Sequence, residues 1–341
     1  MIKKDKILVI QTAFLGDVIL ALPVVQTLKR QLPEAKIDFL CIPNTAPVLE
    51  NHADIKKIIP YDKKGADKLD KFIEVLSEIR ENEYDVVICP HRSFRSAMLT
   101  YYSEAKARAG FNRNSLSFLL TQKIKYEQNK HEIYRNLELV KAVLGKEYDE
   151  NKISLKPRLY PSNNDVNFVH QLFNRSNLIA FAPCSRWFTK QLTIGKSKEI
   201  IQGLINEGYN IALIGGKEDE TYSKTLENQI NDDSLLNLSG KLSPLQSFVV
   251  ISKSKALITV DSAAQHLGAA SNTSIILIYG STNSSFGFYP LTSKHIIIEN
   301  NSLNCRPCTD HGRNKCPLGH FKCIEDLKTG KIITELHKIT P

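Results

Sequence analysis

The stretch KILVIQTAFLGDVILALP, residues 6–23, decides how the chain begins to fold. Lys6–Gln11 is a short apolar run bounded by charge, which predicts a buried strand, and Asp17–Gln31 repeats apolar residues at helical spacing. Gly16 is expected to permit a tight turn between the two, which leaves Asp17 at the helix N-terminus. A strand, a turn and a helix form the first half of a βαβ unit.

The alternation of strands and helices continues in two series. The first series predicts strands at 37–41, 57–60 and 85–89 and helices at 46–51 and 67–81. The second predicts strands at 178–182, 209–214, 256–260 and 274–279 and helices at 196–207, 220–229 and 262–270. Such alternation predicts an α/β protein with two Rossmann-like, doubly wound parallel sheets.

The domain limits follow from composition. The stretch 156–165 is polar and contains two prolines, so it predicts a linker between an N-terminal domain at 1–160 and a second domain at 161–325. The helix-like end, 326–341, is expected to pack back toward the N-terminal domain.

The charge of the chain points to an anionic partner. The formal net charge is +9, which suits nucleic acid, an acidic membrane surface or a phosphorylated small molecule, although a solvated Lys-rich surface would give the same value. The aromatic residues are not interleaved with Lys and Arg, which speaks against nucleic acid. The N-terminal apolar stretch is broken by Gln11, Gly16 and Asp17, and no apolar run is long enough to cross a membrane. We therefore expect a cytoplasmic protein without a signal peptide.

Ligands of open α/β sheets bind beyond the carboxyl ends of the strands, so the residues that follow each strand are the candidates. Asp17 is a candidate general base that removes a proton from an acceptor hydroxyl, or else merely an N-cap. Ser185, Thr189 and Lys190 follow the strand at 178–182 and suit phosphate oxygens, or else form an ordinary polar loop.

Two further strand ends carry similar chemistry. Gly215 and Gly216 end a strand before a run of acids, which suits ribose hydroxyls or simply helix capping. Asp261 ends another strand, and the small residues Ser262–Ala264 leave the amides of the next helix open to a diphosphate. His266, further along that helix, fits a core position or the ligand site.

Together these segments resemble the ADP-heptose:lipopolysaccharide heptosyltransferases of glycosyltransferase family 9, and within them the heptosyltransferase II group. The residues that carry the resemblance are Gly16-Asp17 with Pro23, Ser185-x-Trp187-x-Thr189-Lys190, Gly215-Gly216 with Asp219, Asp261-Ser262-x-x-x-His266, Gly280-Ser281-Thr282, and Cys305-Arg-Pro-Cys308 with Cys316-Pro-Leu-Gly-His320 and Cys323.

The resemblance implies a GT-B fold, in which two Rossmann-like domains face each other across a cleft, and an inverting mechanism without a metal or other cofactor. It implies Asp17 as general base and a donor site of Ser185, Thr189, Lys190, Gly215, Glu218 or Asp219, Asp261, the amides of Ser262, Ala263 and Ala264, and His266. The chain departs from the family pattern at Cys184, Gln191 and Ala263.

A basic cluster follows the strand at 85–89. Arg92, Arg95 and Ser96, with Gly16, are expected to contact an anionic lipopolysaccharide inner core, and Lys106–Arg108 are expected beside them; a solvated basic face is the alternative. The partners expected are thus a nucleotide sugar, this acceptor and the cytoplasmic face of the inner membrane.

The four C-terminal cysteines have the spacing C-x2-C-x7-C-x6-C, which by itself fits structural zinc, reduced thiols or disulfides. Two rival functions also remain: a related GT-B transferase that uses another nucleotide sugar, and a sugar- or nucleotide-binding protein without turnover.

Overall fold

The computed structural model describes residues 3–172 and 175–340, which form two compact units divided after Tyr160 and called unit 1 and unit 2. Both are built on one six-stranded sheet in which every neighbouring pair of strands is parallel.

Unit 1 has the strand order β3-β2-β1-β4-β5-β6. Its strands are β1 (Lys6–Ile10), β2 (Lys36–Cys41), β3 (Lys57–Pro60), β4 (Val86–Cys89), β5 (Ala107–Phe111) and β6 (Gln122–Ile124). Its α-helices are α1 (Leu15–Gln31), α2 (Lys68–Glu81), α3 (Phe94–Tyr102) and α4 (Glu132–Leu144). The helix predicted at 46–51 is a 3-10 helix, Pro43–Leu49, in which Pro47 lacks the N–H that an α-helix would use.

Unit 2 has the strand order β12-β11-β10-β7-β8-β9. Its strands are β7 (Leu178–Ala182), β8 (Asn210–Leu213), β9 (Leu235–Asn237), β10 (Ala256–Val260), β11 (Ser274–Tyr279) and β12 (His295–Glu299). Its α-helices are α5 (Asn163–Leu172), α6 (Ile194–Asn206), α7 (Glu220–Ile230), α8 (Pro244–Lys253), α9 (Ala263–Ser271), α10 (Lys322–Glu325) and α11 (Thr329–Ile339).

The two sheets have the same topology. When the strands of each unit are numbered from its own first strand, both read 3-2-1-4-5-6, the doubly wound Rossmann order. The order reverses between β1 and β4 in unit 1 and between β7 and β10 in unit 2. The predicted α/β class with two Rossmann-like sheets is confirmed, and the two reversal points are where ligands bind in such sheets.

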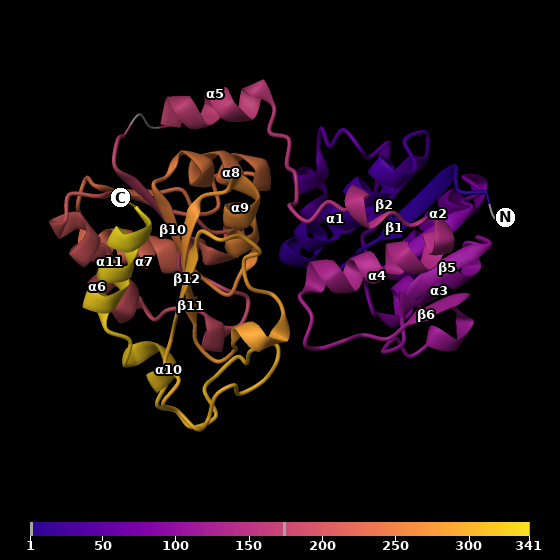
Figure 1. Cartoon of the computed structure of the whole chain (residues 1–341). Coiled ribbons are helices and arrows are strands. Elements are labelled where there is room, and N and C mark those ends of the chain that lie inside the picture. Colours follow the sequence, from indigo (N-terminus) through magenta and orange to yellow (C-terminus); the bar gives the residue numbers. More distant parts are fainter. Residues whose placement is uncertain (1–2, 173–174, 341) are drawn as a thin grey trace. The chain divides into compact units, whose positions relative to one another are not determined.

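The C-terminal helix α11 belongs to unit 2. Its Ile332 and Leu336 are fully buried in the core that also holds Ile200 and Leu204 of α6, and α11 lies beside α6 in Figure 1. Ser274 Oγ also donates to Ile339 O at 2.9 Å. The apolar side of this helix is therefore used within the second unit, and the packing of 326–341 toward the N-terminal domain stays a prediction.

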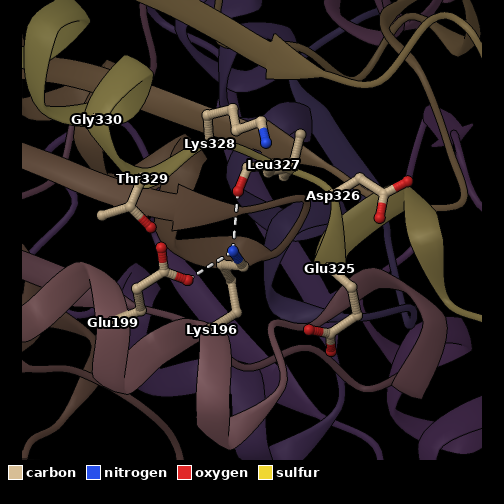
Figure 2. A pocket seen from close by; sticks show the side chains of 8 residues that line it. All are labelled: Lys196, Glu199, Glu325, Asp326, Leu327, Lys328, Thr329 and Gly330. Carbon is tan, nitrogen blue, oxygen red and sulfur yellow. Dashed lines mark hydrogen bonds and ion pairs between the residues drawn. The ribbon is translucent and has the colours of Figure 1, made fainter.

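Lys196 ties the start of α11 to α6. Figure 2 shows its Nζ between Glu199 Oε2, at 2.7 Å, and Leu327 O, at 2.9 Å. These residues line an open hollow of about 600 Å³ with Glu325, Asp326 and the first residues of α11. None of the residues expected to bind donor or acceptor lines this hollow, so we interpret Lys196 as a structural residue.

Candidate active site

Asp17 lies at the reversal point of unit 1, in the first turn of α1. The N-cap of α1 is Phe14, and Asp17 Oδ2 accepts the Phe14 N–H at 3.2 Å, so Asp17 is the third helical residue and not the cap. Gly16 lies within the same turn and does not have a positive φ. The expectation that Gly16 supplies a special turn conformation is therefore wrong, because the helix begins one residue before it.

The carboxyl of Asp17 has an unusual proton affinity. Burial raises the pKa of Asp17 to about 6, and the nearby negative charge of Glu132 adds to the rise. The Phe14 N–H and the Arg92 guanidinium act in the opposite direction. At neutral pH such a carboxyl is mostly ionised, yet it takes up a proton more readily than an ordinary aspartate.

Glu132 is held in place by a buried network at the start of α4. Its Oε2 accepts the Tyr126 hydroxyl at 2.8 Å and Arg135 Nη1 at 2.6 Å, and the Arg135 and Glu132 side chains are only 1% and 8% exposed. Asn136 Nδ2 then donates to Leu20 O at 3.2 Å, which joins α4 to α1 one turn beyond Asp17. The charge that acts on Asp17 is therefore fixed by packing.

A hydroxyl cluster surrounds His91 after β4. His91 Nδ1 lies 2.8 Å from Ser96 Oγ and 2.9 Å from Thr12 Oγ1, and Ser93 Oγ lies 3.2 Å away. Burial, with Lys63 and Arg92, lowers the pKa of His91 to about 4, so the imidazole is neutral. Ser96 is buried and its hydroxyl is engaged here, so it supports the site and does not face an acceptor as the sequence suggested.

The basic residues of unit 1 divide into two groups. Arg92 lies over the Tyr126 ring at 4.1 Å, and Arg95 Nη1 donates to Lys63 O at 2.6 Å. Lys63 Nζ in turn donates to Thr12 O at 2.6 Å, which brings a third cation to the same strand ends. Lys106 instead precedes β5 and so lies at the amino ends of the parallel strands, opposite the carboxyl ends where the other basic residues lie. This corrects the expectation for 106–108.

Lys190 and Asp261 form an ion pair at the reversal point of unit 2. Lys190 Nζ lies 2.7 Å from Asp261 Oδ2, and the two side chains are 15% and 12% exposed. Thr282 Oγ1 donates to the same oxygen at 2.8 Å, and Gln265 Nε2 donates to Oδ1 at 2.9 Å. Lys190 follows β7 and Asp261 follows β10, so adjacent strands bring the pair together.

Two other predicted phosphate ligands are already hydrogen-bonded. Thr189 is 1% exposed, and its Oγ1 accepts the Arg313 N–H at 2.8 Å and the Ser281 hydroxyl at 2.9 Å. Ser185 Oγ donates to Asp261 O at 3.3 Å and remains partly exposed. Lys190 and Ser185 therefore keep part of their surface exposed, whereas the buried Thr189 holds the loop.

The N-terminus of α9 is open. Its N-cap is Ser262, whose side chain makes no cap hydrogen bond, and Ser262, Ala263 and Ala264 are all partly exposed. Free N–H groups and the helix dipole at such an end attract anions. His266, in the next turn, is only 5% exposed and lies among core residues.

Close packing requires Gly215, the first glycine of the pair after β8. A Cβ on Gly215 would lie 2.9 Å from Asp219 Cβ and 3.0 Å from Ser239 Oγ, so a larger residue would not fit. Asp219 Oδ2 accepts the Gly216 N–H at 2.9 Å, and burial raises the pKa of Asp219. Glu218 is exposed, so its carboxylate is the one open to a hydroxyl.

Comparison with known proteins now decides the family. The model of glycosyltransferase family 9 (heptosyltransferase) matches residues 73–318. The chain belongs to this family.

Relatives of this family 9 chain cover its whole length. Lipopolysaccharide heptosyltransferase 2 of Salmonella typhimurium is 25% identical over 98% of both chains. The structure of Escherichia coli ADP-heptose lps heptosyltransferase II is 22% identical with a TM-score of 0.81 and 98% coverage of both chains. The structure of E. coli heptosyltransferase WaaC with ADP is 19% identical with a TM-score of 0.74, over 98% of this chain and 99% of that one. The two structures share the fold, which is of the GT-B type.

The cysteines of this family 9 enzyme are all free thiols, and Cys305, Cys308 and Cys316 are partly exposed. Within residues 3–172 and 175–340, no group of three or more His, Cys, Asp or Glu side chains is arranged to hold a metal ion. No helix in these ranges is long and apolar enough to cross a membrane.

Sequence reasoning missed two residues that the fold brings to the site, Lys63 and Glu132, whereas His91 was expected there as the first residue of the basic cluster 91–96. Lys63 follows a strand, so the strand-end rule could have found it. Glu132 begins α4, far from Asp17 in the sequence, and only helix packing brings its charge to α1.

Proposed function

We propose that this family 9 glycosyltransferase moves a heptose from ADP-heptose onto the inner core of lipopolysaccharide, with inversion at the anomeric carbon and without a divalent ion. The observation that carries the proposal is the position of the Lys190 cation in unit 2. Lys190 follows β7, and the neighbouring strand β10 leads into the open N-terminus of α9. A diphosphate is the anion that suits both at once.

The donor side of the proposal rests on unit 2. The exposed Glu218 beside the glycine pair suits ribose hydroxyls, and Asp261 lies next to Lys190 where the sugar would join the phosphate. The lipopolysaccharide heptosyltransferases that this chain resembles over its full length support heptose as the sugar.

The chemical step assigns one role to each unit. The Asp17 carboxylate accepts the proton of an acceptor hydroxyl, and the hydroxyl oxygen bonds to the anomeric carbon as the bond from that carbon to the phosphate oxygen breaks. The leaving ADP carries the negative charge, which Lys190 and the α9 amides stabilise. A pKa of about 6 for Asp17 suits this role, since the base is ionised at neutral pH.

The acceptor side rests on the basic residues of unit 1. Arg92 and Arg95 lie with Lys63 at the strand ends near Gly16 and Asp17, and they suit the carboxylates and phosphates of an inner core. Phe94 follows β4 and Phe118 follows β5, so both come after the carboxyl ends of strands, and they are 57% and 72% exposed. Cations with exposed aromatic rings support peripheral contact with the cytoplasmic face of the inner membrane.

The decisive experiment mixes the purified protein with ADP-heptose and a heptose-deficient lipopolysaccharide acceptor and measures the product mass. Addition of one heptose is expected, and the same assay with UDP- and GDP-sugars tests the related-transferase alternative. ADP should raise the melting temperature more than UDP or GDP does. Binding of a nucleotide sugar without any transfer or hydrolysis would favour the non-catalytic alternative.

A further inference from the structure

Residues 303–323, called the cysteine segment below, run from the long connection that follows β12 into the first residues of α10. The segment carries Cys305, Cys308, Cys316 and Cys323, and the proposed reaction uses none of them. Its backbone nevertheless reaches the loop that carries Lys190. Thr189 N donates to Arg313 O at 3.0 Å, and Arg313 N donates to Thr189 Oγ1 at 2.8 Å.

A third loop joins these two. Ser281, just after β11, donates its N–H to Thr189 O at 3.1 Å and its hydroxyl to Thr189 Oγ1 at 2.9 Å. Cys308 N donates to Ser281 O at 2.9 Å. The loop of Lys190, the turn after β11 and the cysteine segment are thus linked in pairs by hydrogen bonds.

Arg306 is the side chain that fixes the turn after β11. Its side chain is 4% exposed, and Glu299 Oε2, 2.9 Å from Nη2, balances its charge. Nε donates to Gly280 O at 2.6 Å, Nη2 donates to Thr282 O at 2.8 Å, and Nη1 donates to Asn300 O at 2.8 Å. A guanidinium presents five N–H donors in a rigid plane, whereas an ammonium presents three donors that rotate and fix no plane.

The turn that Arg306 holds leads directly to the ion pair. Thr282 Oγ1 donates to Asp261 Oδ2 at 2.8 Å, and the same oxygen receives Lys190 Nζ at 2.7 Å. A continuous path of contacts therefore runs from Arg306 through Thr282 and Asp261 to Lys190.

The cysteine segment also packs against the stem of Lys190. Gly312 has φ +93°, and a Cβ there would lie 2.7 Å from Trp187 Cβ and 2.9 Å from Lys190 Cδ. The rings of Phe188 and Phe321 stack with centroids 5.1 Å apart. The Lys190 loop is thus held by hydrogen bonds on its backbone and by packing on its side chains.

We propose that the cysteine segment sets the position of Lys190 and Asp261 for the phosphates of the donor, with Arg306 as the positioning residue. The inference rests on the proposed donor site. Arg306 does not itself contact the nucleotide sugar, because its N–H groups already donate to backbone carbonyls and to Glu299. It acts by holding the ion pair in a fixed geometry before the donor arrives.

The test compares Arg306→Lys and Thr282→Val with wild type and with Lys315→Ala, an exposed side chain on the same segment. Arg306→Lys keeps the positive charge but loses the planar set of donors, and Thr282→Val removes only the hydroxyl that reaches Asp261. Both variants should weaken ADP binding in calorimetry and raise the KM for the donor by about tenfold. The KM for the acceptor should not change, and Lys315→Ala should match wild type in both.

Two results would overturn the inference. One is ADP affinity within about twofold of wild type in Thr282→Val, a variant of nearly unchanged volume that remains informative if Arg306→Lys does not fold. The other is an equal rise in the KM of both substrates, which is what general loosening would give. Failure of the proposed donor site is separate: wild type would then not bind ADP, or Lys190→Ala would bind it as wild type does.

Discussion

The two reversal points carry aspartates in opposite surroundings. Asp17 accepts a backbone N–H, lies near the negative Glu132, and has its pKa raised to about 6. Asp261 is paired with Lys190 and accepts two further side-chain donors. The surroundings therefore divide the two aspartates: Asp17 in unit 1 has an increased affinity for a proton, and Asp261 in unit 2 is engaged with a cation. The predictions below test that division.

Replacing Asp17 by Asn should have the largest effect. Asn can still accept the Phe14 N–H but cannot take a proton at neutral pH, so kcat should fall by a factor of about 100 to 10,000. ADP affinity should not change, because the donor residues belong to unit 2. Transfer rate at saturating substrates is measured beside an ADP titration. A variant that keeps more than about a tenth of the wild-type rate would require another base.

The same variant gives a stability readout with a defined sign. The pKa of Asp17 in the folded protein, about 6, exceeds the ordinary value of 3.8. Ionised Asp17 therefore lowers the free energy of unfolding by its full amount above pH 6, and it has no such effect below pH 3.8, where the carboxyl is protonated in both states. Asp17→Asn should therefore raise the melting temperature more at pH 8 than at pH 5. An equal change in melting temperature at both pH values would mean that the surroundings do not raise the pKa of Asp17.

Removing the Lys190 side chain should weaken the binding of the donor and leave the binding of the acceptor unchanged. A charge-assisted hydrogen bond is worth about 1.5–3 kcal/mol, so Lys190→Ala should weaken ADP binding about ten- to a hundredfold. Asp261 would add to the loss, because its charge would then face the diphosphate without a partner. Lys224→Ala, an exposed lysine on α7, is the control in the calorimetric titration. Unchanged ADP affinity would remove Lys190 from the site.

Changing the charges around Asp17 should shift the pH profile by a small amount. The acidic limb of kcat/KM should lie near pH 6; Glu132→Gln should move it down and Arg92→Gln should move it up, with rate changes of up to about twofold at pH 6. Glu138→Gln, an outer carboxylate of α4 paired with Lys130, controls for the loss of a charge on that helix. Shifts in the same direction for both variants would contradict the electrostatic account.

EDTA should leave the rate unchanged. Lys190 and the α9 amides already supply the positive potential that a metal supplies in other transferases, so no step of the proposed reaction requires one. Turnover is assayed before and after chelation, with a melting curve alongside. Activity that EDTA abolishes and magnesium or manganese restores would refute this, and loss that accompanies unfolding would instead favour zinc at Cys305, Cys308, Cys316 and Cys323.

Sequence periodicity was sufficient for the strands that form the centre of each sheet. β7, β10 and β11 lie at the residues predicted, because each is a short, mostly apolar run. The strands β5, β6, β9 and β12 were not predicted. β6 and β9 have three residues each, and β5 contains Arg108 and Gly110, so their patterns are too short or too mixed to recognise.

The identity of the residues at the site was easier to predict than their burial, ion pairs and hydrogen bonds. Lys190 and Asp261 were both identified as strand-end residues, but nothing in the sequence indicated that they neutralise each other. Ser96 and Thr189 were identified by residue type, yet the fold buries both hydroxyls and fills their hydrogen bonds. Local sequence thus indicates which chemistry is present at a strand end, whereas long-range contacts decide which group remains open.

The Lys190–Asp261 pair has a consequence for discrimination among the anions of the cell. An incoming anion does not meet an unbalanced cation, because it must compete with a carboxylate that already lies 2.7 Å away and that Gln265 and Thr282 hold in place. A small anion such as inorganic phosphate exchanges one partner of Lys190 for another and gains little. A diphosphate that also reaches the α9 amides gains a second contact in the same event. In the proposed donor site the ion pair therefore favours an anion long enough to reach both Lys190 and the α9 amides.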